Sequence, residues 1–336
     1  MLGYQHTTFP RRCPMLAKLI GGEAEHKGDG LHSCLTDSGR SSLRLLLRSG
    51  FNKKRFLLPD YLCKIIPEVF DEFQVDYSYY HVHEDMSFDI GNTLQHFDVL
   101  YVINYFGQQS DLSSLQESSA WILEDNVFLP IVENRYNLKN WIGFNSFRKI
   151  SSLADGSIIR ATCKLKDRQI NKSEACFATL KYEAKKIKYE YFHSDSHSEQ
   201  EYLKLFAEAE QLIDDQREIF SISNASLFNL LDFYLNIDRE YQTRNNNCKV
   251  LDEYLAPWRV NKRAKHPSLY AVSLENRDNL RQYLFKHNIF LPVHWPKIAG
   301  ITNLLYDKII SIPMDSRYGE DDMRNVVSLI RRFYGA

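Results

Sequence analysis

Short apolar runs alternate with amphipathic segments through the first half of the chain. The apolar runs have the length and composition of buried strands, at residues 55–58, 75–82, 98–104 and 121–125. The segments between them have helical periodicity, at residues 43–47 and 65–73. This alternation predicts an α/β fold, with a mainly parallel, mixed sheet flanked by helices. Ligands of such sheets bind beyond the carboxyl ends of the strands, where Asn104 and Asp125 stand.

The pattern changes after Gly156. A strand is predicted at 157–162, and long charged helices follow at 181–191, 199–220 and 227–255. A smaller unit then contains strands at 269–274 and 289–293 and helices at 277–287 and 321–333. We therefore predict a large domain over residues 1–215, followed by a helical linker and a small α+β domain over residues 216–336.

Composition narrows the possible classes of protein. The chain has 336 residues, 44% of them apolar, which is enough for about two domains. A formal net charge of −1 gives no basic field that would attract nucleic acid. No apolar run reaches the roughly 18 residues of a membrane span, and the N-terminus lacks a signal pattern. We expect a soluble, cytoplasmic protein.

The cysteines fit a reducing compartment. The sequence has 6 of them, widely spaced and without a CxxC pair, so neither a zinc site nor a disulfide framework is predicted. We expect free thiols, most of them buried. His81 and His83 share one face of a predicted strand, but no third ligand follows at a usual spacing, so no metal site is predicted.

Asp125 is the first candidate for chemistry. It ends an apolar strand, so its carboxylate is expected to be buried and to need a cationic partner. A salt bridge or a helix cap would satisfy this need. The protonated ring nitrogen of a pyridine cofactor would satisfy it as well, and the pairing would keep the ring an electron sink.

Lys149 is the second candidate. A lone lysine is usually a solvated surface charge, but this one lies between an aromatic segment and the turn Ala154–Gly156. A lysine held in such surroundings loses its proton readily and can attack an aldehyde. Asn145, Ser146 and Arg148 stand close enough in sequence to contact a phosphate.

A third candidate precedes the helix at 43–47. Ser38, Gly39 and Arg40 place small residues at a helix start, where free backbone N–H groups can bind an anion. Taken alone, this pattern is more often only a helix cap. In chain order, however, a phosphate cup, an acid ending a strand and a lysine before a glycine turn suggest a pyridoxal phosphate enzyme.

These motifs resemble those of the DegT-type (DegT/DnrJ/StrS) sugar aminotransferases, pyridoxal-phosphate enzymes of the aspartate-aminotransferase fold class, fold type I. The strand ending in Asp125 resembles the family's "IEDA" strand, and Lys149 with Asp155 and Gly156 resembles its lysine and glycine turn. Further stretches resemble family segments at 20–23, 38–41, 58–61, 105–111, 293–296 and 312–319.

The resemblance implies a reaction and a set of site residues. Lys149 would carry pyridoxal 5'-phosphate as a Schiff base and shuttle a proton, while Asp125 would hold the ring nitrogen. An amino acid, often glutamate, would donate its amino group to a nucleotide-linked keto-sugar in a polysaccharide or glycan pathway. A homodimer is implied as well. The implied cofactor contacts are Ser38, Gly39, Arg40, Tyr61, Phe128, Ser146 and Asn224.

Some positions depart from the family pattern. Phe128 stands where the family has His or Gln, and it can stack on a ring but cannot donate a hydrogen bond. Ser157 replaces the second glycine after the lysine, and Asn224 lies where a phosphate-binding segment of the partner subunit is usual. These departures leave open another pyridoxal reaction, or a member that binds cofactor or sugar without turnover.

His294 and Trp295 follow a predicted strand near the expected cleft. They can line the substrate site, and packing in the core explains them about as well. Lys149 itself argues against the related dehydratase branch of the family, in which histidine replaces the lysine.

Overall fold

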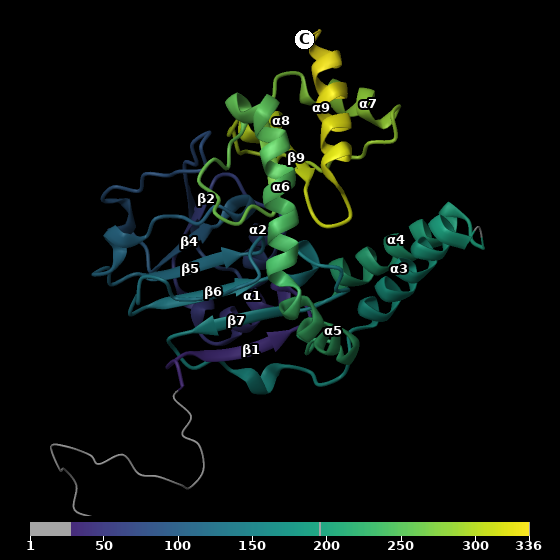
Figure 1. The fold of residues 1–336 in the computed structure, drawn as a ribbon. Coiled ribbons are helices and arrows are strands. Elements are labelled where there is room, and N and C mark those ends of the chain that lie inside the picture. The colour runs from purple at the N-terminus through teal and green to yellow at the C-terminus, as the bar shows by residue number, and fades with distance from the viewer. Residues whose placement is uncertain (1–27, 195, 336) are drawn as a thin grey trace, which may run out of the picture. The chain divides into compact units, whose positions relative to one another are not determined.

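The computed structural model describes residues 28–194 and 196–335, and the helices and strands named below belong to the unit that begins at Leu31 (Figure 1). The family-like segment at 20–23 and the N-terminal residues that lack a signal pattern lie outside the described residues.

The main sheet has 7 strands in the order β1-β7-β6-β5-β4-β2-β3. The strands are β1 (His32–Thr36), β2 (Phe56–Pro59), β3 (Tyr77–Tyr80), β4 (Val99–Ile103), β5 (Trp121–Asn126), β6 (Trp141–Asn145) and β7 (Ser157–Ala161). Strands β2 to β6 run parallel to one another, whereas β7 is antiparallel to both β6 and β1. The predicted fold class, with a mainly parallel mixed sheet flanked by helices, is confirmed.

This topology gathers distant chain segments at one edge of the sheet. Because β7 is antiparallel to both of its neighbours, β1 runs the same way as β6. The carboxyl ends of β1, β2, β4, β5 and β6 therefore share an edge with the amino end of β7. The residues at this edge are Asp37 and Ser38, Asp60 and Tyr61, Asn104, Asp125, Ser146 and Gly156.

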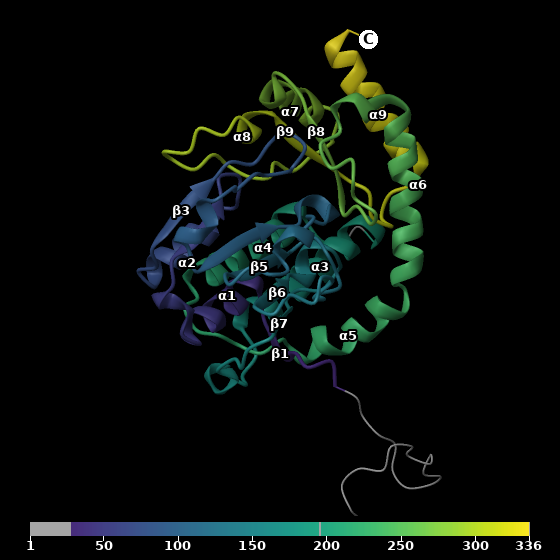
Figure 2. The ribbon, with the colours of Figure 1, turned by 90° about the vertical axis from the view of Figure 1, so that its left-hand side faces the viewer.

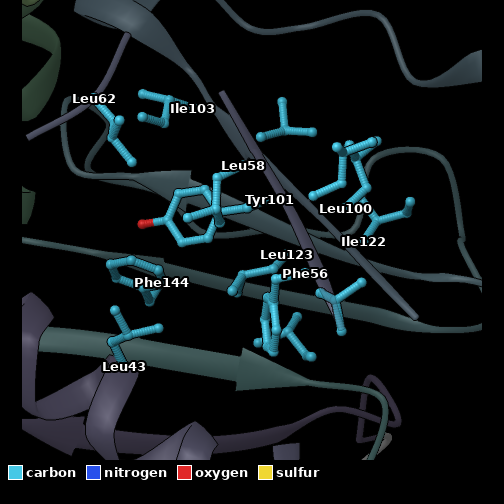
Figure 3. Close-up of a cluster of buried hydrophobic side chains, with 14 of the residues drawn as sticks. Leu43, Phe56, Leu58, Leu62, Leu100, Tyr101, Ile103, Ile122, Leu123 and Phe144 are labelled. Atoms are coloured by element: carbon cyan, nitrogen blue, oxygen red, sulfur yellow. The ribbon is translucent and has the colours of Figure 1, made fainter. Parts of the chain in front are cut away.

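Helices α1 (Gly39–Arg48) and α2 (Ile65–Glu72) pack against one another, and α1 covers β1, β6 and β7. The inner strands β2, β4 and β6 are buried along their whole length, as expected for parallel strands covered on both faces. Figure 3 shows Tyr101 among Leu58, Leu123 and Phe144 in this core.

A helical hairpin follows the sheet. Helices α3 (Cys176–Ser194) and α4 (Glu199–Asp215) lie side by side, as Figures 1 and 2 show. Ser198 and Glu201 form a capping box at the start of α4, so that the orphan N–H groups of its first turn are satisfied locally.

The helix predicted over 227–255 is wrong as a single element. It is divided into α5 (Asn224–Leu235) and α6 (Ile237–Leu255) at Asn236. The Asn236 side chain donates hydrogen bonds to the backbone and side-chain oxygens of Asp232, and its backbone N–H also bonds the Asp232 carbonyl. An asparagine that bonds back to the preceding turn ends a helix locally.

A second sheet pairs β8 (Leu269–Ser273) with β9 (Ile309–Pro313) in antiparallel fashion. Around it lie α7 (Arg277–Phe285), α8 (Leu305–Lys308) and α9 (Glu320–Tyr334). The strand predicted at 289–293 is wrong, because β9 takes the place beside β8 and residues 289–293 form no strand. Pro292 lacks a backbone N–H and only accepts one hydrogen bond, from Ser311.

Short 3₁₀ turns complete the described chain, at Phe51–Lys53, Thr93–His96, Tyr105–Gly107, Ser113–Leu115, Phe147–Lys149, Asp167–Gln169 and Ala256–Trp258. The main sheet lies before residue 215 and the second sheet after it, but the proposed domain division at that point stays a prediction.

The cysteines in the described ranges are free thiols, but only Cys248 is buried and Cys176 is exposed. The expectation that most are buried is therefore wrong, since the others lie in half-buried surface positions; Cys13 falls outside the described residues. None of the helices in residues 28–194 and 196–335 combines the length and apolar character needed to cross a bilayer.

Candidate active site

Asp125 lies at the carboxyl end of β5, and its side chain is almost fully buried. Its carboxylate accepts hydrogen bonds from the Tyr101 hydroxyl at 2.7 Å and from the Val127 backbone N–H at 3.0 Å. Burial raises the pKa of Asp125 to about 6, although these two bonds and the charge of Lys149 oppose the rise. The carboxylate is thus desolvated and gains from any further cation placed beside it.

Lys149 ends the short turn Phe147–Lys149 that follows β6. Its side chain has access to solvent, yet protein surrounds it closely enough that burial is the main cause lowering its pKa. Arg148 and Arg40 lower the pKa further, while Glu210 and Cys63 raise it. No hydrogen bond or ion pair to its amine occurs within the described ranges. An amine with a lowered pKa is a better nucleophile than an unperturbed lysine.

The start of helix α1 presents free donors at the same edge of the sheet. Ser38 caps the helix, with its side-chain oxygen accepting from the Ser41 backbone N–H at 3.2 Å. The backbone N–H groups of Gly39 and Arg40 have no hydrogen-bond partner in the part of the chain that the structure describes. A Cβ at position 39 would lie 3.4 Å from the Phe144 ring and from the Asn145 carbonyl, at van der Waals contact. This helix start can therefore accept an anion.

Asp37 stands beside that helix start and is completely buried. Gln216 donates to its carboxylate at 2.6 Å, and the Ser38 hydroxyl donates at 3.3 Å. Burial raises the pKa of Asp37 to about 6, so the group carries less negative charge at the helix start than an exposed aspartate would.

Two arginines flank the helix start and the lysine turn. The Arg40 guanidinium bonds the Ile213 carbonyl at 2.8 Å and Asp214 at 2.6 Å, so its side chain is occupied by α4. Arg148 pairs with Glu210 at 3.2 Å, and its buried Nε has no partner within the described residues. Ser146 is a largely buried residue, and no hydrogen bond to its hydroxyl occurs in the same ranges.

An aromatic wall closes the site on the side of the second sheet. The buried Phe128 ring contacts the rings of His294 at 5.5 Å and Trp295 at 6.2 Å. Tyr61 packs on Trp295 at 5.4 Å, and its hydroxyl donates to the His294 carbonyl. Residues predicted separately as cofactor and substrate contacts thus form one cluster.

His294 is neutral at ordinary pH. Burial lowers the pKa of its imidazole to about 3, and the charge of Lys149 lowers it further. Its Nδ1 lies 3.0 Å from the Ser311 hydroxyl of β9, which holds the ring in place.

The turn after Lys149 is fixed by Asp155 and Gly156. The Asp155 carboxylate accepts hydrogen bonds from the Ser223 backbone and hydroxyl, both at 2.7 Å, and from the Ser226 hydroxyl. Gly156 has φ +112°, and a Cβ there would lie 2.6 Å from Ile222. The glycine that the sequence singled out is required by both backbone conformation and space.

The structure places Asn224 and Ser157 in local hydrogen bonds of the described chain. Asn224 is exposed at the start of α5, and its backbone N–H donates to Glu174 at 2.9 Å. Ser157 is buried and donates to the Asn145 carbonyl at 2.5 Å, close to the Ser42 hydroxyl at 2.8 Å. The hydroxyl of Ser157 therefore links β7 to β6 and α1, and Asn224 makes no contact with Lys149 or Asp125 in the described chain.

Sequence reasoning missed some residues that shape the site. Tyr101 holds Asp125, and their proximity follows from the strand register, in which Tyr101 and Ile103 pair with Leu123 and Asp125 on the neighbouring strand. Lys185 and Glu210 follow from no such register, because they reach the lysine turn only through the docking of the α3–α4 hairpin.

Comparison with known proteins was made at the level of sequence and of structure. No family model matches the sequence, and no curated protein matches it either. Solved structures do match. A DegT DnrJ EryC1 StrS aminotransferase from Brucella abortus has a TM-score of 0.62 at 16% identity, covering 91% of this chain and 86% of that chain.

The fold is that of the sugar aminotransferases. Helicobacter pylori PseC, an aminotransferase involved in pseudoaminic acid biosynthesis, has a TM-score of 0.61 at 13% identity, with coverage of 90% and 87%. The sugar aminotransferase Spr1654 from Streptococcus pneumoniae, in its PMP form, has a TM-score of 0.60 at 13% identity, with coverage of 89% and 87%. The predicted resemblance therefore extends over most of the chain as a shared sugar-aminotransferase fold.

Proposed function

We propose that this protein is a pyridoxal-phosphate-dependent aminotransferase that moves an amino group from an amino acid, in the first instance glutamate, to a nucleotide-linked keto-sugar. The observation that carries the proposal is the placement of the Lys149 amine and the buried Asp125 carboxylate at the same edge of the sheet. Lys149 and Asp125 lie at the carboxyl edge of a sheet with the sugar-aminotransferase fold, and the charge of the lysine lowers the pKa of the carboxyl group.

The residues present fit the cofactor. Asp125 is a buried carboxylate that a protonated pyridine nitrogen would stabilise, and Lys149 is an amine suited to bond an aldehyde. The free amides of Gly39 and Arg40, with the Ser146 hydroxyl, can receive the phosphate. Phe128 and Tyr61 offer apolar contact to the ring. When bound, the cofactor supplies an electron sink for the carbon that gains or loses a proton.

The chain's own residues then divide the work of amino transfer. The Lys149 amine would hold the cofactor and would accept and return the proton at the reacting carbon. Asp125 would keep the ring nitrogen charged. In the net reaction the donor amino group replaces the carbonyl oxygen of the keto-sugar; one water supplies the oxygen of the keto acid, and one water is released from the keto-sugar.

The substrate would enter against the aromatic wall. His294 and Trp295 lie beside Phe128 and provide one neutral imidazole and one large apolar face. A neutral imidazole can hydrogen-bond a sugar hydroxyl without favouring a charged group at the same place. We place the activity in cytoplasmic assembly of a polysaccharide or glycan.

We also propose a homodimer. Helix α5 exposes a row of large apolar side chains, Phe228, Leu231 and Leu235, which are costly to leave in water. Ser223, the N-cap of α5, donates a hydrogen bond to Asp155 in the turn that follows Lys149. A second copy packed on α5 would therefore lie close to the active site.

The test is spectroscopic. Purified protein incubated with pyridoxal phosphate should develop the visible absorption band of a lysine-bound cofactor, and glutamate should convert it to the pyridoxamine form. Lys149→Ala should abolish the band, whereas Lys139→Ala, a change at an exposed lysine, should leave it intact.

Three outcomes would contradict parts of the proposal. Absence of any band in the wild type would exclude the enzyme. A band that survives Lys149→Ala would exclude this lysine. A band that no amino acid converts would favour a protein that binds the cofactor without transferring an amino group. The apolar side chain of Phe128 is consistent with that alternative.

A further inference from the structure

Three basic side chains converge behind the lysine turn, and we call Arg148, Lys181 and Lys185 the hairpin cation cluster. Arg148 Nη1 lies 3.2 Å from Glu210 Oε1, and Lys181 Nζ bonds the same oxygen. Lys185, one turn further along α3, donates to the Ser152 carbonyl at 2.6 Å and the Leu153 carbonyl at 3.1 Å. The cluster is therefore fixed to the turn that carries Lys149.

The cluster has more positive charge than its surroundings neutralise. Across residues 28–194 and 196–335, Glu210 is the one carboxylate in ion-pair contact with any of the three cations. Lys185 binds only backbone carbonyls there. The buried Nε of Arg148 donates to nothing among these residues, although a buried donor normally has a partner.

The positive charges of the cluster and of its neighbours repel one another. Burial, followed by the charges of Lys181, Arg148 and Arg317, lowers the pKa of Lys185 to about 8. Arg317 reaches the cluster from the loop between β9 and α9, where Asp315 pairs with it at 2.5 Å. A bound anion would remove the repulsion, so the arrangement suits a ligand with negative charge.

We propose that the hairpin cation cluster binds the diphosphate of the substrate, at a place separate from the site of the cofactor phosphate. The inference rests on the proposed function, which supplies the nucleotide-linked sugar. Lys149 stands in the chain between Arg148 and the Ser152 and Leu153 carbonyls that Lys185 binds, and the charge of Arg148 helps to lower the pKa of the lysine. A diphosphate held by the cluster would therefore leave the sugar near Lys149. The cofactor phosphate has its own donors in the free amides of Gly39 and Arg40.

The first experiment titrates inorganic pyrophosphate into the cofactor-loaded protein by calorimetry. Lys185→Gln keeps N–H groups for the two carbonyls but removes the charge, so it should weaken pyrophosphate binding about tenfold. The KM for the nucleotide-linked sugar should rise similarly, with kcat and the cofactor band unchanged. Lys186→Gln, an exposed neighbour paired with Glu190, is the matched control and should behave as wild type. Lys185→Arg should restore binding.

A second measurement needs no variant and covers the case in which Lys185→Gln does not fold. Amine acetylation followed by mass spectrometry should show pyrophosphate protecting Lys185 but not Lys186 in the loaded wild-type protein.

The other possible results separate this inference from the proposed function. A normal cofactor band with pyrophosphate affinity unchanged by Lys185→Gln, or with Lys185 unprotected, would overturn this inference and leave the proposed function standing. Pyrophosphate binding that disappears on loading the cofactor would assign the cluster to the cofactor phosphate and overturn it too. A protein without the band would instead reject the proposed function.

Discussion

At the residue scale, the burial of Asp125 determines how the site responds to pH. Its carboxyl group has a pKa of about 6 in the cofactor-free protein because desolvation outweighs the bonds from Tyr101 and Val127. A raised pKa means that the group prefers to be neutral, and its charged form is fully present only above that value.

Cofactor affinity should therefore fall as the pH falls through about 6, because Asp125 must lose its proton to pair with the ring nitrogen. The expected slope is up to about tenfold in dissociation constant per pH unit. Titration of pyridoxal phosphate binding on both sides of this pH measures it. Asp125→Asn should bind more weakly and lack this step, and an unchanged step in that variant would assign it to another group.

Gly156 gives a second prediction for a single residue. Gly156→Ala should destabilise the protein by about 2–3 kcal/mol, since the new methyl meets Ile222 at 2.6 Å and the backbone has φ +112°. Urea unfolding measures the loss.

Gly300→Ala is the matched control for that measurement. Gly300 has φ +85° but nothing within 4 Å of a new Cβ, so only the conformational cost of about 1 kcal/mol should appear. Equal losses in the two variants would show that the contact with Ile222 contributes nothing.

At the scale of elements, one carboxylate joins the lysine turn to helix α5. Asp155 is fully buried and accepts hydrogen bonds from the Ser223 backbone, the Ser223 hydroxyl and the Ser226 hydroxyl. Ser223 is also the N-cap of α5, so the same residue satisfies the helix start and binds the turn.

Asp155→Ala should lower the free energy of unfolding by about 3 kcal/mol, because it leaves three buried donors without their acceptor. Thermal or urea unfolding tests this. Asp238→Ala, at an exposed aspartate in the first turn of α6, should change stability by less than about 0.5 kcal/mol. A similarly small loss for Asp155→Ala would mean that water replaces its contacts.

At the scale of the whole molecule, the exposed face of α5 should set the oligomeric state. Phe228, Leu231 and Leu235 are 78%, 68% and 84% exposed, and a second copy would remove them from water. Sedimentation of the wild type should show a dimer, and Leu235→Lys should shift it toward monomer.

The control for the dimer is Leu304→Lys, at a residue that is 60% exposed on the segment before α8. It should leave sedimentation unchanged. A monomeric wild type, or equal effects of the two substitutions, would remove α5 as the contact between subunits.

The amino-acid sequence by itself determined the order of strands and helices in the first half of the chain, and it singled out Lys149 and Asp125 as the candidates for chemistry. Period and residue type are local properties, so the apolar strands and the glycine turn at Gly156 could be identified without coordinates. One error had a local cause and the other a non-local one. The break at Asn236 depends on its own side chain, and the strand expected at 289–293 was displaced when β9 paired with β8.

Only the tertiary structure decided which groups surround the two site residues. The position of β7 makes β1 parallel to β6, and this brings Gly39 to the same edge as Lys149. The docking of α3 and α4 adds Lys185 and Glu210, which are far from Lys149 in sequence. The burial of a side chain and the charge around it depend on residues that are distant in sequence. The raised pKa of Asp125 and the excess positive charge of the hairpin cation cluster therefore arise only in the folded chain.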